Sequence, residues 1–176
     1  MLIEHISSGE NPPEDINVLV EVPLAGDPVK YEIDKKSGAI FVDRFLHTSM
    51  FYPGNYGFIP HTLSGDGDPV DVLVVGRTPV VAGSVLRARP VGVLMMEDEA
   101  GQDEKIIAVP HTKLHSYYSE ISKHDELPGI ATQTIEHFFS HYKDLEVGKW
   151  VKVNGWGSPE DAHRMILQAI EREKAA

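Results

Sequence analysis

The sequence contains no cysteine, no long apolar run and fewer basic than acidic side chains. The absence of cysteine excludes disulfides, thiolate metal sites and cysteine nucleophiles. No apolar run approaches the roughly 18 residues of a membrane-spanning helix. The first residues include Glu4, Glu10, Glu14 and Asp15, whereas a signal peptide begins with basic residues and an apolar stretch. We therefore expect a cytoplasmic protein that does not bind membranes.

The charge balance is acidic: 16 Lys and Arg stand against 27 Asp and Glu, a formal net charge of −11. Because nucleic-acid backbones attract basic surfaces, this balance opposes nucleic-acid binding. The chain has 176 residues, 41% of them hydrophobic, and no repeat or linker divides it. These properties are typical of one globular domain, which we expect to span residues 1–176.

Short segments rich in β-branched residues and separated by glycine and proline predict strands. They are residues 16–23, 30–34, 39–46, 71–79, 84–97, 104–110 and 149–156. In the first of them, Val18, Val20 and Val22 alternate with Leu19 and Glu21, which predicts two opposite faces.

Two helices are predicted late in the chain. Residues 128–146 carry an apolar stripe at helical spacing. A second helix begins after Ser158, a good N-cap residue, with Pro159 at its first position. Many short strands followed by helices indicate an α+β fold, which we expect to be a small closed barrel with flanking helices.

Three carboxylates crowd the segment "DGDPVD", where Asp66, Asp68 and Asp71 lie within six residues. A calcium-binding EF-hand loop is excluded, because its fifth and twelfth positions would be Val70 and Arg77. A solvated turn before a strand is the alternative interpretation.

Two observations favour a cation site over a solvated turn. Pro69 restricts the geometry of the turn, which a solvated turn does not require. A second acidic stretch, residues 96–105, places Asp98 and Asp103 around another glycine turn. Oxygen-only carboxylate clusters suit Mg²⁺ or Mn²⁺ better than zinc.

The histidines offer a rival metal site. His111 and His115 are four residues apart, as are His137 and His141. Neither pair has the HExxH form or an evident third ligand. We interpret them as surface or subunit-contact residues rather than as a zinc site.

Basic and phenolic side chains accompany the acids. Tyr52 and Tyr56 lie just upstream of the triplet and offer hydroxyl donors to an anion, although aromatic packing explains them equally well. The basic candidates are Lys30, Arg44, Lys105 and Lys143. Together with the acids they make a site of mixed sign, as phosphoryl-transfer centres require.

Several blocks of the sequence resemble those of a known family. "DGDPVDV" resembles the signature of soluble family I inorganic pyrophosphatases, Asp-x-Asp-Pro-x-Asp followed by an aliphatic residue. The blocks "VEVP", "KYE", "FYPGNYGFIPHT", "HFFSHYKDLE" and "KWVKVNGW" also resemble family blocks in family order. The compact length is similar to that of the bacterial branch.

The resemblance implies a five-stranded OB-like β-barrel with flanking α-helices, assembled as a homohexamer. It implies Mg²⁺-dependent hydrolysis of pyrophosphate to two orthophosphates by direct attack of a metal-activated water. Several Mg²⁺ ions per site are implied, with Mn²⁺ or Zn²⁺ as substitutes.

The resemblance also implies roles for individual residues. The tight metal ligands are Asp66, Asp71 and Asp103, and the supporting acids are Glu21, Glu32 and Asp98. Asp68 matches the carboxylate that orients and deprotonates the water. The phosphate-binding groups are Lys30, Arg44, Tyr56, Lys105, Tyr142 and Lys143, with Tyr52 as a supporting phenol. Among them, Lys30, Arg44 and Tyr56 act with Asp68 in catalysis.

These seven acids and four cations leave a net charge of about −3 if all are ionised. Without metals such a pocket repels a polyanion, since one like-charge pair at ~4 Å costs about 4 kcal/mol at an effective dielectric constant near 20. Two alternatives remain: a metal-dependent hydrolase of nucleotides or longer polyphosphates, and an OB-like binding module without turnover.

Overall fold

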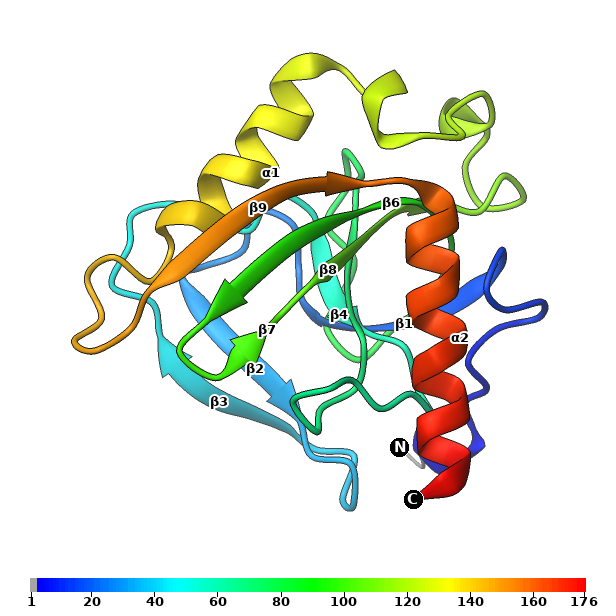
Figure 1. The fold of residues 1–176 in the computed structure, drawn as a ribbon, viewed down its shortest axis with the longest axis horizontal. Coiled ribbons are helices and arrows are strands. Elements are labelled where there is room, and N and C mark those ends of the chain that lie inside the picture. The colour runs from blue at the N-terminus through cyan, green and yellow to red at the C-terminus, as the bar shows by residue number, and fades with distance from the viewer. Residues whose placement is uncertain (1–2) are drawn as a thin grey trace.

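The computed structural model describes residues 3–176 and has an α+β architecture (Figure 1). The main sheet contains β1 (Ile16–Val22), β4 (Asn55–Phe58), β5 (Asp71–Val74), β6 (Val85–Asp98), β7 (Gly101–Gln102), β8 (Lys105–Pro110) and β9 (Val151–Gly157). A separate two-stranded sheet contains β2 (Val29–Ile33) and β3 (Ile40–Phe45). The helices are α1 (Gly129–His141) and α2 (Pro159–Ala175), with short 3₁₀ turns η1 (Ile3–His5), η2 (Ser116–Tyr118) and η3 (His124–Glu126).

Five strands of the main sheet pair in a ring. β1 pairs with β4, β4 with β5, β5 with β8, β8 with β6, and β6 pairs back with β1. Only the β5–β8 pairing is parallel. The 14-residue strand β6 also pairs with β9, so it connects the ring to the last strand of the chain.

Both faces of the sheet are buried, each under one helix. In β5, Leu73 belongs to the apolar cluster that includes Phe138 of α1. Its neighbour Val72 belongs to the cluster that includes Ile166 of α2. Because successive strand residues point to opposite faces, one short strand contributes to both clusters. Figure 1 shows the two helices on different sides of the sheet.

The alternation predicted for the first strand is wrong at its end. Val18 packs in the cluster under α2, whereas Val22 packs in the cluster under α1. The register of β1 against β4 shifts between Val20 and Val22, so Glu21 is an extra residue on this strand. Such a bulge turns the following side chains to the other face.

One strand was not predicted, and two predicted elements end well before the expected residue. Residues 47–62, in which no strand was predicted, contain β4. A glycine is needed at position 57 of this strand, because an added Cβ would lie 2.0 Å from the carbonyl oxygen of Leu19. The strand predicted over 71–79 ends at Val74. The helix predicted over 128–146 ends at His141, and residues 142–149 form successive turns instead.

The start of α2 is confirmed. Ser158 Oγ accepts a hydrogen bond from the Asp161 backbone N–H at 3.1 Å, and Asp161 Oδ2 accepts one from the Ser158 N–H at 2.9 Å. This reciprocal pair satisfies two N–H groups that the first helical turn leaves free. Within residues 3–176, no helix has both the length and the apolarity needed to cross a membrane.

Candidate active site

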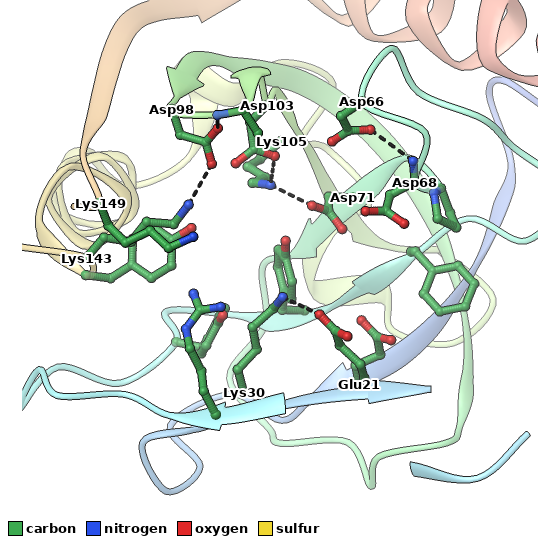
Figure 2. Close-up of a pocket in the computed structure, with 18 of the residues that line it drawn as sticks. Glu21, Lys30, Asp66, Asp68, Asp71, Asp98, Asp103, Lys105, Lys143 and Lys149 are labelled. Atoms are coloured by element: carbon green, nitrogen blue, oxygen red, sulfur yellow. Dashed lines mark hydrogen bonds and ion pairs between the residues drawn. The ribbon is translucent and has the colours of Figure 1, made fainter. Parts of the chain in front are cut away.

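An open cavity of about 360 Å³ lies between the β2–β3 hairpin, the turn before β5 and the end of β6 (Figure 2). Every residue that the sequence assigned to the site lines this cavity. They are Glu21, Lys30, Glu32, Arg44, Tyr52, Tyr56, Asp66, Asp68, Asp71, Asp98, Asp103, Lys105, Tyr142 and Lys143. The fold therefore gathers into one place groups that the chain separates by more than a hundred residues.

The turn before β5 carries the first acids. Asp66 Oδ1 accepts a hydrogen bond from the backbone N–H of Asp68 at 3.0 Å, and the Ser64 N–H donates to the Asp68 carbonyl at 2.7 Å. Gly67 has φ +94°, a left-handed conformation that glycine adopts without steric cost. Asp71 follows as the first residue of β5. The hydrogen bonds of the turn thus fix the backbone positions from which its carboxylate side chains extend.

The end of β6 and the short β7 hold two further acids. Asp98 Oδ1 accepts from the Ala100 N–H at 2.8 Å, and its Oδ2 accepts from Lys143 Nζ at 2.6 Å. Burial alone would raise the pKa of Asp98, but these hydrogen bonds outweigh it and lower the pKa below its usual value. The backbone N–H of Asp103 donates to the Met96 carbonyl at 3.0 Å, which orders the chain after the hairpin.

Lys105 lies between two of the acids. Its Nζ is 2.5 Å from Asp71 Oδ2 and also donates to Asp103 Oδ1, although the residue is only 2% exposed. Burial favours the neutral amine, but the two carboxylates outweigh it and raise the pKa of Lys105. Burial likewise raises the pKa of Asp103 despite the nearby ammonium. Among the described residues, no three acids or histidines already form a metal-ligand group.

Glu21 lies deepest among the acids at the bulge of β1. Its Oε1 accepts a hydrogen bond from the Ile33 backbone N–H at 2.8 Å. Burial, with a smaller contribution from the charge of Asp71, raises the pKa of Glu21 to about 8. At neutral pH this carboxyl group is therefore mostly protonated, which removes one negative charge from the cavity.

The β2–β3 hairpin carries cations on the facing wall. Lys30 and Arg44 are cross-strand partners. Lys30 Nζ is 2.5 Å from Glu32 Oε1, while Arg44 Nε donates to Glu146 Oε1 at 3.2 Å and Arg44 Nη1 to Asp43 Oδ2 at 3.0 Å. Figure 2 shows Lys30 directed across the cavity toward the acidic turn.

Three buried phenols line the back of the cavity. The Tyr52 and Tyr56 rings lie 5.0 Å apart, and Tyr142 stacks on Phe138 at 5.3 Å. Burial raises the pKa of all three phenols, so each remains protonated. Their hydroxyl groups are therefore hydrogen-bond donors beside the buried Lys105.

Three further charged residues line the cavity that were not predicted from the sequence: Lys35, Glu99 and Lys149. Lys149 Nζ lies 2.5 Å from Glu99 Oε1. No sequence signal marks this pair, because its members are fifty positions apart in the chain. With them, eight acids face six cations, a net charge of −2 if all are ionised.

The histidine pairs lie outside the cavity lining. The His137 and His141 rings are 4.7 Å apart on α1, and His141 Nδ1 is 2.7 Å from Asp144 Oδ2. His111 Nε2 is 3.8 Å from Asp15 Oδ2.

Comparison with known proteins shows the family of the chain. The family model described as inorganic pyrophosphatase matches residues 18–174. The chain belongs to the inorganic pyrophosphatase family. It is 62% identical over 175 residues to an inorganic pyrophosphatase of Rhodospirillum rubrum, and 61% identical over 174 residues to one of Mesorhizobium japonicum. Each alignment covers 99% of this chain and 98% of the relative.

Solved structures show the same similarity. An inorganic phosphatase from Anaplasma phagocytophilum superposes with a TM-score of 0.94 at 54% identity, covering 96% of this chain and 99% of the other. The inorganic pyrophosphatase from Thermus thermophilus superposes with a TM-score of 0.92 at 42% identity, covering 99% of both chains. The resemblance stated from the sequence motifs is thus confirmed at the level of the family.

The pKa of Glu21 predicts a pH-dependent stability in protein kept free of divalent ions with EDTA. The unfolded chain loses the Glu21 proton near the ordinary value of 4.5, whereas the folded chain keeps it to about 8. Because the folded state binds more protons in this window, Glu21 lowers stability as pH rises from about 5 to about 8. Glu21→Gln, which retains an acceptor for Ile33, should remove a slope of up to about 1.4 kcal/mol per pH unit.

Urea titrations across this window measure the effect. Glu173→Gln is the matched control, because Glu173 is exposed on α2. An identical pH slope in wild type and Glu21→Gln would show that Glu21 ionises normally in the folded protein.

Proposed function

We propose that this chain hydrolyses pyrophosphate to two orthophosphates in a Mg²⁺-dependent reaction within this cavity. One observation carries the proposal: carboxylates and cations from separate elements face one another around a space of about 360 Å³. Family membership supports the substrate, since the relatives are named inorganic pyrophosphatases. Pyrophosphate carries up to four negative charges. The acids alone would repel it, whereas basic groups together with added cations would offset its charge.

The donor set fits hard divalent ions. Every acidic group in the cavity offers carboxylate oxygen, and the residues that line it include no histidine, which favours Mg²⁺ or Mn²⁺. The family resemblance adds Zn²⁺ as a further substitute. We assign Asp66, Asp71 and Asp103 as tight ligands, supported by Asp98, Glu32 and Glu21. Bound there, several Mg²⁺ ions would lower the pKa of a water molecule and offset the charge of the phosphates.

Asp68 is the proposed acceptor for the proton of the attacking water. It lies in the same short turn as Asp66, and the Asp66 side chain holds its backbone N–H. A carboxylate in this turn would lie close to a water molecule held by the neighbouring ligands, as general-base catalysis requires.

The facing wall would bind the substrate. Lys30, Arg44 and Tyr56 are proposed to stabilise charge that develops on the leaving phosphate. The other phosphate-binding groups are Lys105, Tyr142 and Lys143, with Tyr52 as a supporting phenol. The protonated phenols and the charged Lys105 support these roles, because all of them donate hydrogen bonds to anions.

We infer that the ring of five paired strands is a closed OB-like barrel within one domain over residues 1–176. A homohexamer is the proposed assembly. It is supported by exposed apolar side chains on and beside β3, where a partner surface would cover them. These are Ile40, Phe41, Val42, Phe45 and Phe51. The cytoplasmic location, and the absence of nucleic-acid partners, remain predictions.

A phosphate-release assay tests the reaction and the metal requirement together. Wild type should release orthophosphate rapidly from pyrophosphate with Mg²⁺, and at least about a hundredfold more slowly in EDTA. ATP and tripolyphosphate serve as competing substrates. Faster turnover of ATP would indicate a nucleotide hydrolase, and no turnover with Mg²⁺, Mn²⁺ or Zn²⁺ would indicate a binding module.

Asp68→Asn separates proton transfer from metal binding. The amide cannot accept the proton, so we expect kcat to fall about a hundredfold to ten-thousandfold while Mn²⁺ affinity changes little. Isothermal titration measures the affinity, and Asp125→Asn, at an exposed acid of η3, is the control. A near-normal kcat in Asp68→Asn would remove Asp68 from the general-base role.

A further inference from the structure

The turn between β2 and β3 presents Lys35 to the mouth of the cavity. Asp34 fixes this turn: its Oδ2 accepts from the Ser37 backbone N–H at 2.7 Å and from Ser37 Oγ at 2.6 Å. The Gly38 N–H donates to the Asp34 carbonyl at 2.7 Å, and Gly38 has φ +68°. Lys35 thus extends from a turn whose backbone is held in place.

Lys35 reaches across the mouth to the opposite wall. Its Nζ is 3.7 Å from Asp68 Oδ1, with the two side chains 55% and 79% exposed. A pair this exposed adds little to folding stability, because water and salt screen it. Among the described residues it is the only ion pair that joins the β2–β3 turn to the acidic turn.

Within residues 3–176, the side-chain oxygens of Asp68 make no other hydrogen bond or ion pair. The contacts of its turn involve the Asp68 backbone N–H and carbonyl, but not its side-chain oxygens. Without Lys35, this exposed side chain is free to rotate into solvent. A proton acceptor acts only within hydrogen-bond reach of the water, so its orientation matters for the chemical step.

We propose that Lys35 is a positioning residue that holds the Asp68 carboxylate over the cavity. This inference rests on the proposed function, in which Asp68 accepts the proton of the attacking water. Lys35 needs no contact with substrate for this role. Its loss should therefore lower the rate of the chemical step and leave the apparent affinity for pyrophosphate unchanged.

Lys36 provides a matched control. It is the next residue in the same turn and carries the same charge, but it does not line the cavity. Lys35→Gln and Lys36→Gln change the net charge equally. Lys35→Arg keeps a cation of similar reach.

The experiment measures kcat, KM and the single-turnover hydrolysis rate for Mg²⁺-pyrophosphate in wild type and the three variants. Lys35→Gln should lower kcat and the single-turnover rate about threefold to fivefold, the size expected for an exposed ion pair. KM should stay within about twofold of wild type. Lys36→Gln should match wild type, and Lys35→Arg should recover most of the lost rate.

Three outcomes would overturn the inference while leaving the proposed function intact. In the first, wild type is active and Lys35→Gln turns over as fast. In the second, Lys35→Gln raises KM with kcat unchanged, which makes Lys35 a substrate contact. In the third, Lys36→Gln loses as much rate as Lys35→Gln, which would attribute the loss to the net charge of the turn rather than to the Lys35–Asp68 contact. A wild type that releases no phosphate with any of the metals would remove the proposed function itself.

Discussion

Repulsion among carboxylates in one confined cavity is the constraint on which the rest of the structure depends. Two like charges at ~4 Å repel by about 4 kcal/mol at an effective dielectric constant near 20. Internal groups offset this cost: Lys105 lies between Asp71 and Asp103, and Glu21 keeps its proton at neutral pH. The carboxylate charge that these groups do not offset leaves the pocket acidic, so bound cations would stabilise it.

The fold keeps several of these acids together by attaching them to buried strands of the main sheet. β5, β6 and β8 lie in the main sheet, and residues on both of its faces belong to buried clusters. Two of the acids stand at strand ends, Asp71 at the start of β5 and Asp98 at the end of β6, and Asp66 and Asp68 lie in the turn before β5. Lys30 and Arg44 lie instead on the separate β2–β3 sheet, whose β3 strand is largely exposed. The acidic wall of the site therefore extends from buried strands, whereas the basic wall lies on a hairpin with one largely exposed strand.

The sequence blocks were enough to recognise the family, and the resemblance named most of the charged and phenolic residues that line the cavity, because each block carries its chemistry within a few residues. The start of α2 could be predicted from Ser158 and Pro159, since the chemistry of a helix N-terminus is local. The face to which the Val22 side chain points could not be predicted, because the bulge in β1 depends on pairing with β4, more than thirty residues further along the chain. Strand β4 was missed because Gly57 resembles a turn residue until Leu19 packs against it. The Lys149–Glu99 and Lys35–Asp68 pairs likewise exist only after folding.

Calorimetric binding of imidodiphosphate, a pyrophosphate analogue whose bridging nitrogen resists hydrolysis, tests most directly whether cations convert the acidic cavity into an anion receptor. Titrations of wild type should show binding at least about a hundredfold tighter with Mg²⁺ than in EDTA. Equal or tighter binding in EDTA would contradict this, because the basic wall alone would then hold the anion against the acids.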